Sequence, residues 1–157
     1  MSEANQICFR AAQPGEAEAL TGLCREAKRH WGYPEAWLDV WRGELTVSPE
    51  FIRRQGVGVA ELAGAIVGCY GLRRDDDVWH LEHFWLRPAP IGRGLGRALF
   101  GEAVREARAG GATELLIKSD PNAEPFYRRM GAERVRVETY LLLGAIPRTV
   151  PHLRFGL

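Results

Sequence analysis

The sequence predicts an α/β fold with a sheet of mixed direction. Segments with apolar or alternating residues, typical of strands, are interleaved with segments in which apolar residues recur every three or four positions, as in amphipathic helices. A strand at 78–86, a helix beginning at Leu95 and a strand at 113–117 follow one another, and this order favours a right-handed parallel crossover. The length of 157 residues suits one domain, which we expect to span 1–157.

The N-terminal part is expected to contain one strand followed by helices. Residues 7–12 alternate weakly, as in a strand, and Pro14 suits the first turn of the helix that follows. This helix should end near the segment "HWGYP", and Ser48 should cap a short helix further on. Between them we expect a second helix. The apolar stripes are Ala17, Leu20, Leu23, Cys24 and Ala27 in the first helix, and Trp37, Leu38, Trp41 and Leu45 in the second.

A meander of three strands is expected next. Residues 57–62 and 65–72 should form a hairpin around Ala63 and Gly64, and the aspartates at 75–77 mark the following turn. Both sides of the strand at 78–86 are largely apolar, so this strand is expected to be central. By alternation, Val78, His80, Glu82, Phe84 and Leu86 should lie on one side, and Trp79, Leu81, His83 and Trp85 on the other.

The C-terminal part predicts two helices and three strands. An apolar stripe from Leu95 to Ala107 indicates a helix that ends at Gly110 and Gly111. The strand at 113–117 is apolar enough to be buried, and a short helix at 122–130 should end at Gly131. Strands are expected at 133–143 and 152–157.

Composition excludes several classes of partner. Lys and Arg number 21 and Asp and Glu 20, so no basic field indicates nucleic acid. No apolar segment is long enough to span a membrane. The three cysteines lack the CxxC spacing of a metal site, and the N-terminal segment lacks the pattern of a signal peptide. We therefore expect a reduced, cytoplasmic protein with no metal, membrane or nucleic-acid partner.

The segment "LRPAPIGRGLGRALF" has glycines at alternate positions, Gly92, Gly94 and Gly96, where a helix begins. Backbone N–H groups at a helix start attract anions, and glycine lets a phosphate approach them closely. Arg93 and Arg97 would oppose the helix dipole unless an anion were bound there, although two solvated arginines are an equal alternative. The spacing fits neither the dinucleotide motif G-x-G-x-x-G nor a P-loop, whose Lys is replaced by Glu102.

These residues resemble the GNAT superfamily of N-acetyltransferases. "LEHFWLRPAPIGRGLGRAL" is similar to its acetyl-coenzyme A motif, Q/R-x-x-G-x-G/A, and "SDPNAEPFYRRMGA" to its second signature. "KRHWGYPEAW" and "IPRTVPHLRFGL" resemble small bacterial members. Two positions depart from the pattern: Ile91 replaces the usual Gln or Arg, and Ala132 replaces an aromatic residue. The resemblance implies a mostly antiparallel sheet with a central parallel pair, flanked by about four helices.

The resemblance also implies the co-substrate, acetyl-CoA, and the residues that would bind it. The backbone of Phe84, Trp85 and Leu86 would hold the pantetheine arm, with one N–H available to the oxyanion, and Asn122 would hydrogen-bond the arm. The glycine segment would receive the pyrophosphate. Its residues are Gly92, Arg93, Gly94, Leu95, Gly96 and Arg97.

Direct attack by an amine, through a tetrahedral intermediate, needs a base and an acid. Tyr127 matches the family tyrosine that protonates the departing thiolate; the alternative is a half-buried aromatic residue. Glu82 is the candidate base, because a carboxylate among apolar neighbours accepts a proton readily; the alternative is a salt-bridged strand residue. His83, His80 and a chain of waters are further alternatives.

The acceptor is expected to be a primary amine, on a small molecule or a protein. "HWGY" lies in the segment that lines the acceptor side in this family, so Trp31 and Tyr33 are candidate acceptor residues, with core packing as the alternative. A homodimer is compatible with the resemblance. The rival function is a catalytically silent module that binds acyl-coenzyme A or a nucleotide as a sensor or partner domain.

Overall fold

The structure is a computed structural model that describes residues 6–88 and 94–157. Its helices lie close to the predicted positions. A 3-10 turn at Pro14–Glu16 leads directly into α1, as expected from Pro14 at the start of that segment. None of the described helices is long and apolar enough to cross a membrane. The α-helices are α1 (Ala17–His30), α2 (Glu35–Val40), α3 (Pro49–Arg54), α4 (Leu95–Ala109) and α5 (Glu124–Met130).

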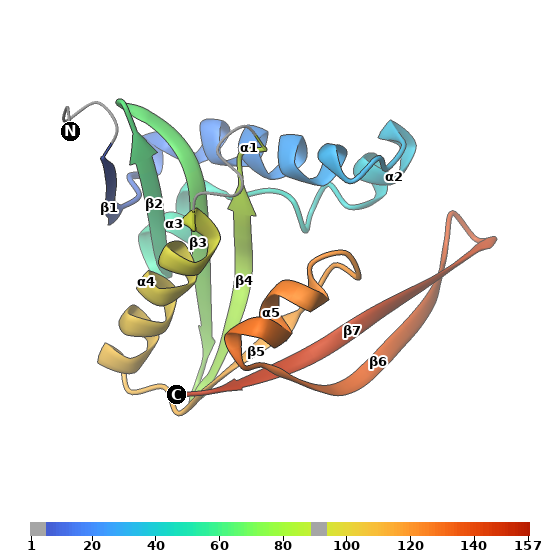
Figure 1. The fold of residues 1–157 in the computed structure, drawn as a ribbon. Coiled ribbons are helices and arrows are strands. Elements are labelled where there is room, and N and C mark those ends of the chain that lie inside the picture. The colour runs from blue at the N-terminus through green and yellow to red at the C-terminus, as the bar shows by residue number, and fades with distance from the viewer. Residues whose placement is uncertain (1–5, 89–93) are drawn as a thin grey trace.

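The seven strands of the described residues form one sheet in the order β1-β2-β3-β4-β5-β7-β6 (Figure 1). The central position predicted for the strand at 78–86 is confirmed, because β4 lies between β3 and β5. It pairs in parallel with β5, and all other neighbours are antiparallel. The strands are β1 (Ile7–Ala11), β2 (Gly56–Leu62), β3 (Ala65–Asp75), β4 (Val78–Leu86), β5 (Glu114–Lys118), β6 (Glu133–Leu142) and β7 (Ile146–Gly156).

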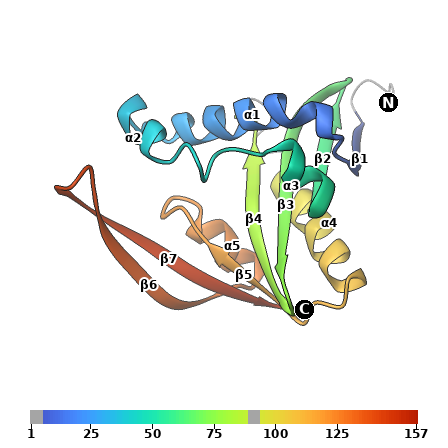
Figure 2. The same ribbon diagram turned by 180° about the vertical axis from the view of Figure 1, so that it is seen from behind.

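Helices cover both faces of this sheet, and each face has its own apolar cluster. On one face α4 and α5 pack through Leu99, Phe100 and Tyr127 (Figure 1). On the other face α1, α2 and α3 pack through Leu20, Leu38 and Ile52, among others (Figure 2). The central strand β4 contributes side chains to both clusters. Burial on two faces explains why six of its nine residues are aliphatic or aromatic apolar residues.

A β-bulge in β4 changes the predicted alternation of its side chains. The register passes from Gly71 opposite His83 to Leu72 opposite Leu81, so Glu82 has no partner on β3. The prediction that Phe84 and Leu86 share a face with His80 is therefore wrong. These two residues instead lie on the α4 side, with Trp79 and Leu81 before the bulge. An extra residue in one strand shifts the alternation by one position and bends the strand.

Two other expectations need correction. The second helix ends at Val40, and the chain continues through turns to Leu45, although Trp41 and Leu45 are buried as expected. The last strand begins at Ile146, six residues before the predicted start at 152. Proline normally disfavours strands because it lacks an N–H, but the Pro151 carbonyl still accepts a hydrogen bond from the Ser119 N–H at 2.9 Å. A long β6–β7 hairpin results.

Candidate active site

The parallel strands β4 and β5 pair at one end and diverge at the other. Their register pairs His80 with Leu116, and Figure 1 shows the strands separating beyond that point. The Arg87 N–H donates to Val67 O at 2.7 Å, so the alternating residues Leu86 and Phe84 direct their backbone N–H and C=O groups away from β3. Among the described residues no strand pairs with this edge. Backbone donors and acceptors are thus available to a ligand between the two strands.

Two cavities open where the strands diverge. The first, of about 400 Å³, is lined by Tyr127 and is called the Tyr127 cavity. The second, of about 510 Å³, is lined by Arg148 and is called the Arg148 cavity. Both volumes suit small-molecule sites. The two cavities share the lining residues Leu81, Glu82, Trp85, Lys118 and Asp120, so they meet beside the bulge of β4.

The Tyr127 cavity brings together several residues predicted to bind coenzyme. Phe84, Trp85, Leu86 and Asn122 line it together with Tyr127. The Tyr127 ring lies against Phe84 and Phe126 in edge-on contacts, with ring centres 5.9 and 5.4 Å apart. Burial, and secondarily the negative charge of Asp120, raises the pKa of the Tyr127 phenol. The phenol is therefore protonated at neutral pH and can donate a proton.

The start of α4 lies beside this cavity. Gly94 caps the helix in the left-handed conformation, with φ at 73°, and a Cβ atom there would meet open space. A Cβ on Gly96 would lie 3.3 Å from Leu86 and 3.2 Å from Phe126, so glycine allows close packing of α4. The first turn has no acidic residue, and Arg97 is exposed there. Gly92, Arg93 and Ile91 lie outside the described residues.

Glu82, the candidate base, is the bulged residue of β4 and lines both cavities. Its carboxylate accepts a hydrogen bond from Arg73 Nε at 3.1 Å, and its side chain is 39% exposed. Glu82 therefore has the salt bridge that the sequence analysis gave as the alternative to a base. The position still suits a base, because Glu82 is within the lining that the two cavities share.

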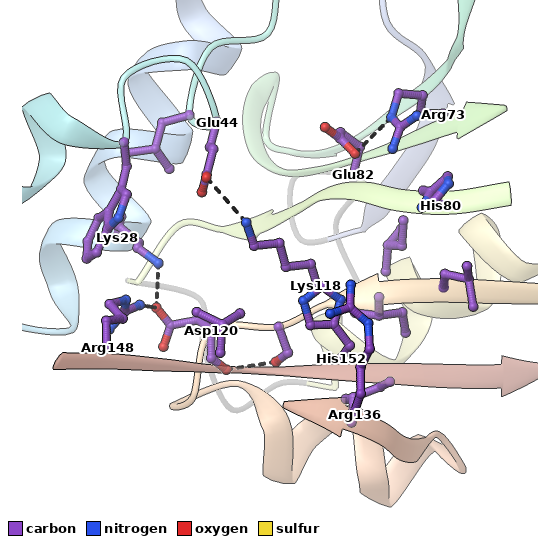
Figure 3. Close-up of a pocket in the computed structure, with 18 of the residues that line it drawn as sticks. Lys28, Glu44, Arg73, His80, Glu82, Lys118, Asp120, Arg136, Arg148 and His152 are labelled. Atoms are coloured by element: carbon purple, nitrogen blue, oxygen red, sulfur yellow. Dashed lines mark hydrogen bonds and ion pairs between the residues drawn. The ribbon is translucent and has the colours of Figure 1, made fainter. Parts of the chain in front are cut away.

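A buried ionic cluster forms one wall of the Arg148 cavity. Lys28 Nζ and Arg148 Nη2 lie 2.5 and 3.2 Å from the same Asp120 oxygen, Oδ2. The Tyr33 hydroxyl donates to Asp120 Oδ1 at 3.2 Å, and the Asn122 N–H donates to the same atom at 2.8 Å. Figure 3 shows Lys28 and Arg148 both directed at Asp120, with Lys118 between this cluster and the Arg73–Glu82 pair. We call Lys28, Asp120 and Arg148 the ionic cluster.

Burial and the neighbouring opposite charges shift the pKa values of Lys28 and Asp120 in opposite directions. Burial lowers the pKa of Lys28, although the nearby Asp120 charge opposes the effect. Burial alone would raise the pKa of Asp120, but Lys28, the Asn122 N–H and Arg148 together lower it. Asp120 is therefore ionised at neutral pH. Both cations also stack on Trp41, at 4.5 Å from the ring centre in each case.

The two predicted acceptor residues have different surroundings. Trp31 is 46% exposed and lines the Tyr127 cavity. Tyr33 packs against Trp37 and Trp41, and its hydroxyl accepts hydrogen bonds from Asn122 Nδ2 at 2.9 Å and Arg148 Nη1 at 3.1 Å. Tyr33 thus supports the ionic cluster, and its role as an acceptor residue stays a prediction.

The two histidines considered as bases differ in access. His83 is buried, with Phe51 edge-on to its ring at 5.3 Å, and its Nδ1 accepts from Trp85 Nε1 at 3.3 Å. Burial lowers the pKa of His83 to about 4. His80 lines the Arg148 cavity, and burial also lowers its pKa. No group of three or more His, Cys, Asp or Glu side chains in the described parts of the chain could hold a metal ion.

The sequence model of the Acetyltransferase (GNAT) family matches residues 18–132, which include β4, the start of α4 and Tyr127. The chain belongs to the GNAT acetyltransferase family. The match ends before the β6–β7 hairpin, which supplies Arg148. None of the curated proteins matches the chain.

Solved structures agree with this family. A GCN5-related N-acetyltransferase from Rhodopseudomonas palustris superposes with a TM-score of 0.78 at 20% identity, over 100% of this chain and 99% of that one. The PaiA N-acetyltransferase of Thermoplasma acidophilum, solved with coenzyme A, gives 0.79 at 18% identity, over 97% and 99%. YncA of Salmonella typhimurium, solved with acetyl-CoA, gives 0.69 at 18%, over 98% and 95%. At these identities the likeness establishes the GNAT fold.

Sequence reasoning missed the ionic cluster, and of its three residues only Lys28 lies in an element that the sequence predicted. Lys28 follows Ala27 at the edge of the apolar stripe of α1, and a charge at that position was a usable signal. Asp120 lies in a loop before Pro121, and Arg148 lies between two prolines. Neither position has a periodic pattern. The cluster depends on the divergence of β4 and β5, which no local pattern in this GNAT sequence indicates.

Proposed function

We propose that this protein is an N-acetyltransferase that transfers the acetyl group of acetyl-CoA to a primary amine. Membership of the GNAT acetyltransferase family supports the acyltransferase activity. The observation that carries the proposal is that two cavities meet beside Glu82 and an unpaired strand edge. One cavity would hold the donor and the other the acceptor, with the reacting atoms where they meet.

The residues of the Tyr127 cavity fit an acyl-CoA arm. The arm is an extended amide chain, and the free edge of β4 at Phe84 and Leu86 offers N–H and C=O groups to pair with it, as a neighbouring strand would. Asn122 adds a side-chain amide to the lining of this cavity. The pyrophosphate would lie at the start of α4, where Gly94 leaves open space and Arg97 supplies positive charge.

The proposed transfer is a direct attack by the neutral amine on the thioester carbonyl. A nitrogen–carbon bond forms, and the carbon–sulfur bond breaks in the collapse of the tetrahedral intermediate. Glu82 takes the proton that the amine loses, directly or through water, and Tyr127 gives a proton to the departing thiolate. A backbone N–H of Phe84 or Leu86 would stabilise the oxyanion. Exchange with solvent then restores both side chains.

The test of this proposal has two parts. Calorimetry should show binding of acetyl-CoA, with little binding of NAD as the control. Coenzyme A release with a panel of primary amines should exceed the release without amine, and mass spectrometry should find the acetylated amine. Binding of acetyl-CoA without acetylation of any amine would contradict the enzyme assignment and support a silent binding module.

A further inference from the structure

The ionic cluster of the Arg148 cavity has more positive than negative charge. Two cations, Lys28 and Arg148, share the single carboxylate of Asp120. The side chains of all three residues are at most 10% exposed, so water screens them weakly. Buried charges are normally paired, because an uncompensated one is costly. The excess charge therefore calls for an anion that is not part of the described chain.

The neighbouring charged groups do not supply that anion. Glu44, the acidic residue beside Lys28, forms an ion pair with Lys118 at 3.4 Å. Glu82 pairs with Arg73 on the other side of Lys118 (Figure 3). Further cations and titratable groups line the cavity, namely Arg136, His80 and His152, and the last pairs with Glu138. Of these groups only Glu44 acts on Lys28, and its effect is smaller than that of Asp120, so the ionic cluster keeps an excess of positive charge.

Hydrogen-bond donors remain for such an anion. Asp120 is saturated, because Oδ2 receives Lys28 and Arg148 while Oδ1 receives Tyr33 and Asn122. Lys28 has three N–H donors and Arg148 five. Within the described residues Lys28 uses one donor, on Asp120, and Arg148 uses two, on Asp120 and Tyr33. Both residues line the cavity.

The rest of the wall suits an apolar body. Trp41, Trp85 and Tyr140 line the cavity together with aliphatic residues such as Leu45 and Val150. The cavity of about 510 Å³ is in the range for a small molecule. A ligand here would place a charged end on the ionic cluster and carbon atoms against the aromatic rings.

We infer that the acceptor is a small amine that also carries a carboxylate, which Lys28 and Arg148 bind. This inference rests on the proposed function and names the substrate class of the same site. The guanidinium of Arg148 matches a planar carboxylate. The positive field of the cluster also favours the neutral form of the amine, which is the form that attacks. Cationic amines without an anionic group, such as diamines, should be poor acceptors.

The first experiment needs no variant. Initial rates are measured at saturating acetyl-CoA for α-, β- and ω-amino acids, each beside its primary amide and its decarboxylated amine. The charge-assisted contact predicts that kcat/KM for the best amino acid exceeds that of its amide by roughly 10- to 100-fold. Equal or greater kcat/KM for the amides would overturn the inference while leaving the acetyltransferase proposal intact. Failure of every amine would instead contradict the proposed function.

Substitutions of Arg148 test whether this residue causes the preference for an amino acid over its amide. Arg148→Met keeps the packing on Trp41 and leaves Lys28 and Asp120 as a neutral pair, so the acid-to-amide ratio should fall by roughly 10- to 100-fold. Arg148→Lys keeps the charge and should retain most of the ratio. Arg54→Met is the control for net charge, because Arg54 is exposed on α3 and lines neither cavity. Its ratio should match the native protein.

Folding and ligand chemistry are checked separately. If Arg148→Met unfolds, calorimetry of the native protein with coenzyme A decides, since the amino acid should bind more tightly than its amide. If Arg148→Met folds and keeps the native ratio, the cluster is structural and the inference is wrong.

Phosphoethanolamine tests whether the cluster binds a phosphate group in preference to a carboxylate. Acetylation of that amine in preference to every amino acid would overturn the carboxylate assignment.

Discussion

The Tyr127 and Arg148 cavities adjoin but offer different groups to a ligand. The Tyr127 cavity offers the backbone edge of β4, the aromatic rings of Phe84 and Phe126, and a buried phenol. The Arg148 cavity offers a cluster of buried ions and a wall of tryptophans. In the proposed function, backbone groups would bind a constant feature of a common donor, whereas side chains would distinguish acceptors. Donor recognition can thus persist in a family while the acceptor changes.

The largest expected effect separates chemistry from binding in the Tyr127 cavity. Tyr127→Phe keeps the ring contacts and removes the hydroxyl. If chemistry limits turnover, kcat should fall roughly 10²- to 10⁴-fold, as for loss of a general acid. The acetyl-CoA Kd should change little, because the β4 edge and the α4 start are intact. Single-turnover kinetics and calorimetry measure the two quantities.

Other results for Tyr127→Phe would assign a different role. A large loss of acetyl-CoA affinity would make Tyr127 a binding residue. An unchanged single-turnover rate would show that water or another group protonates the sulfur. Because burial raises the pKa of Tyr127, the rate of the native protein should show no ionisation of this phenol near neutral pH.

A second change tests whether the donor's pyrophosphate lies at the start of α4. Gly94→Asp places a negative charge there, and repulsion should weaken acetyl-CoA binding by about 100-fold or more. Gly94→Asn is the matched control, because Asn and Asp both tolerate the left-handed conformation of this residue. Only the Asp variant should lose affinity by calorimetry. Equal affinities of the two variants would remove the pyrophosphate from this position.

A third prediction concerns the stability of β4, the strand that lines both cavities, as the pH falls. His83 anchors β4 beside the bulge, and its pKa falls from 6.5 in the unfolded chain to about 4 in the fold. Between these values only the unfolded chain binds the proton, so stability is lost as the pH falls from 6.5 to 4. The loss amounts to about 3 kcal/mol in the free energy of unfolding.

Denaturant unfolding of two variants checks this pH dependence. His83→Asn has no titrating ring but keeps an acceptor for Trp85, so it should lose most of the slope between pH 6.5 and 4. His30→Asn changes an exposed histidine and should keep the native slope. If His83→Asn retains that slope, another group causes the acid sensitivity.

The smallest effect concerns Trp31, for which the family resemblance and the cavity lining give different expectations. The resemblance places this residue on the acceptor side, whereas its side chain lines the Tyr127 cavity. Trp31 is 46% exposed, so Trp31→Ala should raise the KM of acetyl-CoA by at most about tenfold. The order of preference among amines should not change. A changed order would return Trp31 to the acceptor site.

Most of the fold could be predicted because its signals are local. The stripe of α4, the left-handed turn at Ala63 and Gly64, and the apolar faces of β4 each lie within one short segment. The bulge at Glu82 could not be predicted. A bulge leaves one residue of the strand unpaired and bends the strand, and no particular residue type is required to form it. The start of β7 was missed because Pro147 and Pro151 normally disfavour a strand.

The candidate site divides in the same way. Phe84, Trp85, Leu86, Asn122 and Tyr127 were predicted from two short motifs, and the structure places them around one cavity. Their chemical roles stay predictions. The ionic cluster joins three segments: helix α1, the loop that follows β5, and strand β7. Its members are more than 25 residues apart in sequence. Side chains from such distant segments converge only through tertiary structure.

A crystal structure with coenzyme A bound would show whether donor and acceptor occupy different cavities that meet beside Glu82. We expect the pantetheine arm along Phe84 and Leu86, the sulfur near the Tyr127 hydroxyl and the pyrophosphate at Gly94. The Arg148 cavity should remain accessible to an amine. Electron density for the arm in the Arg148 cavity, against Lys28 and Trp41, would show that the assignment of the two cavities is wrong.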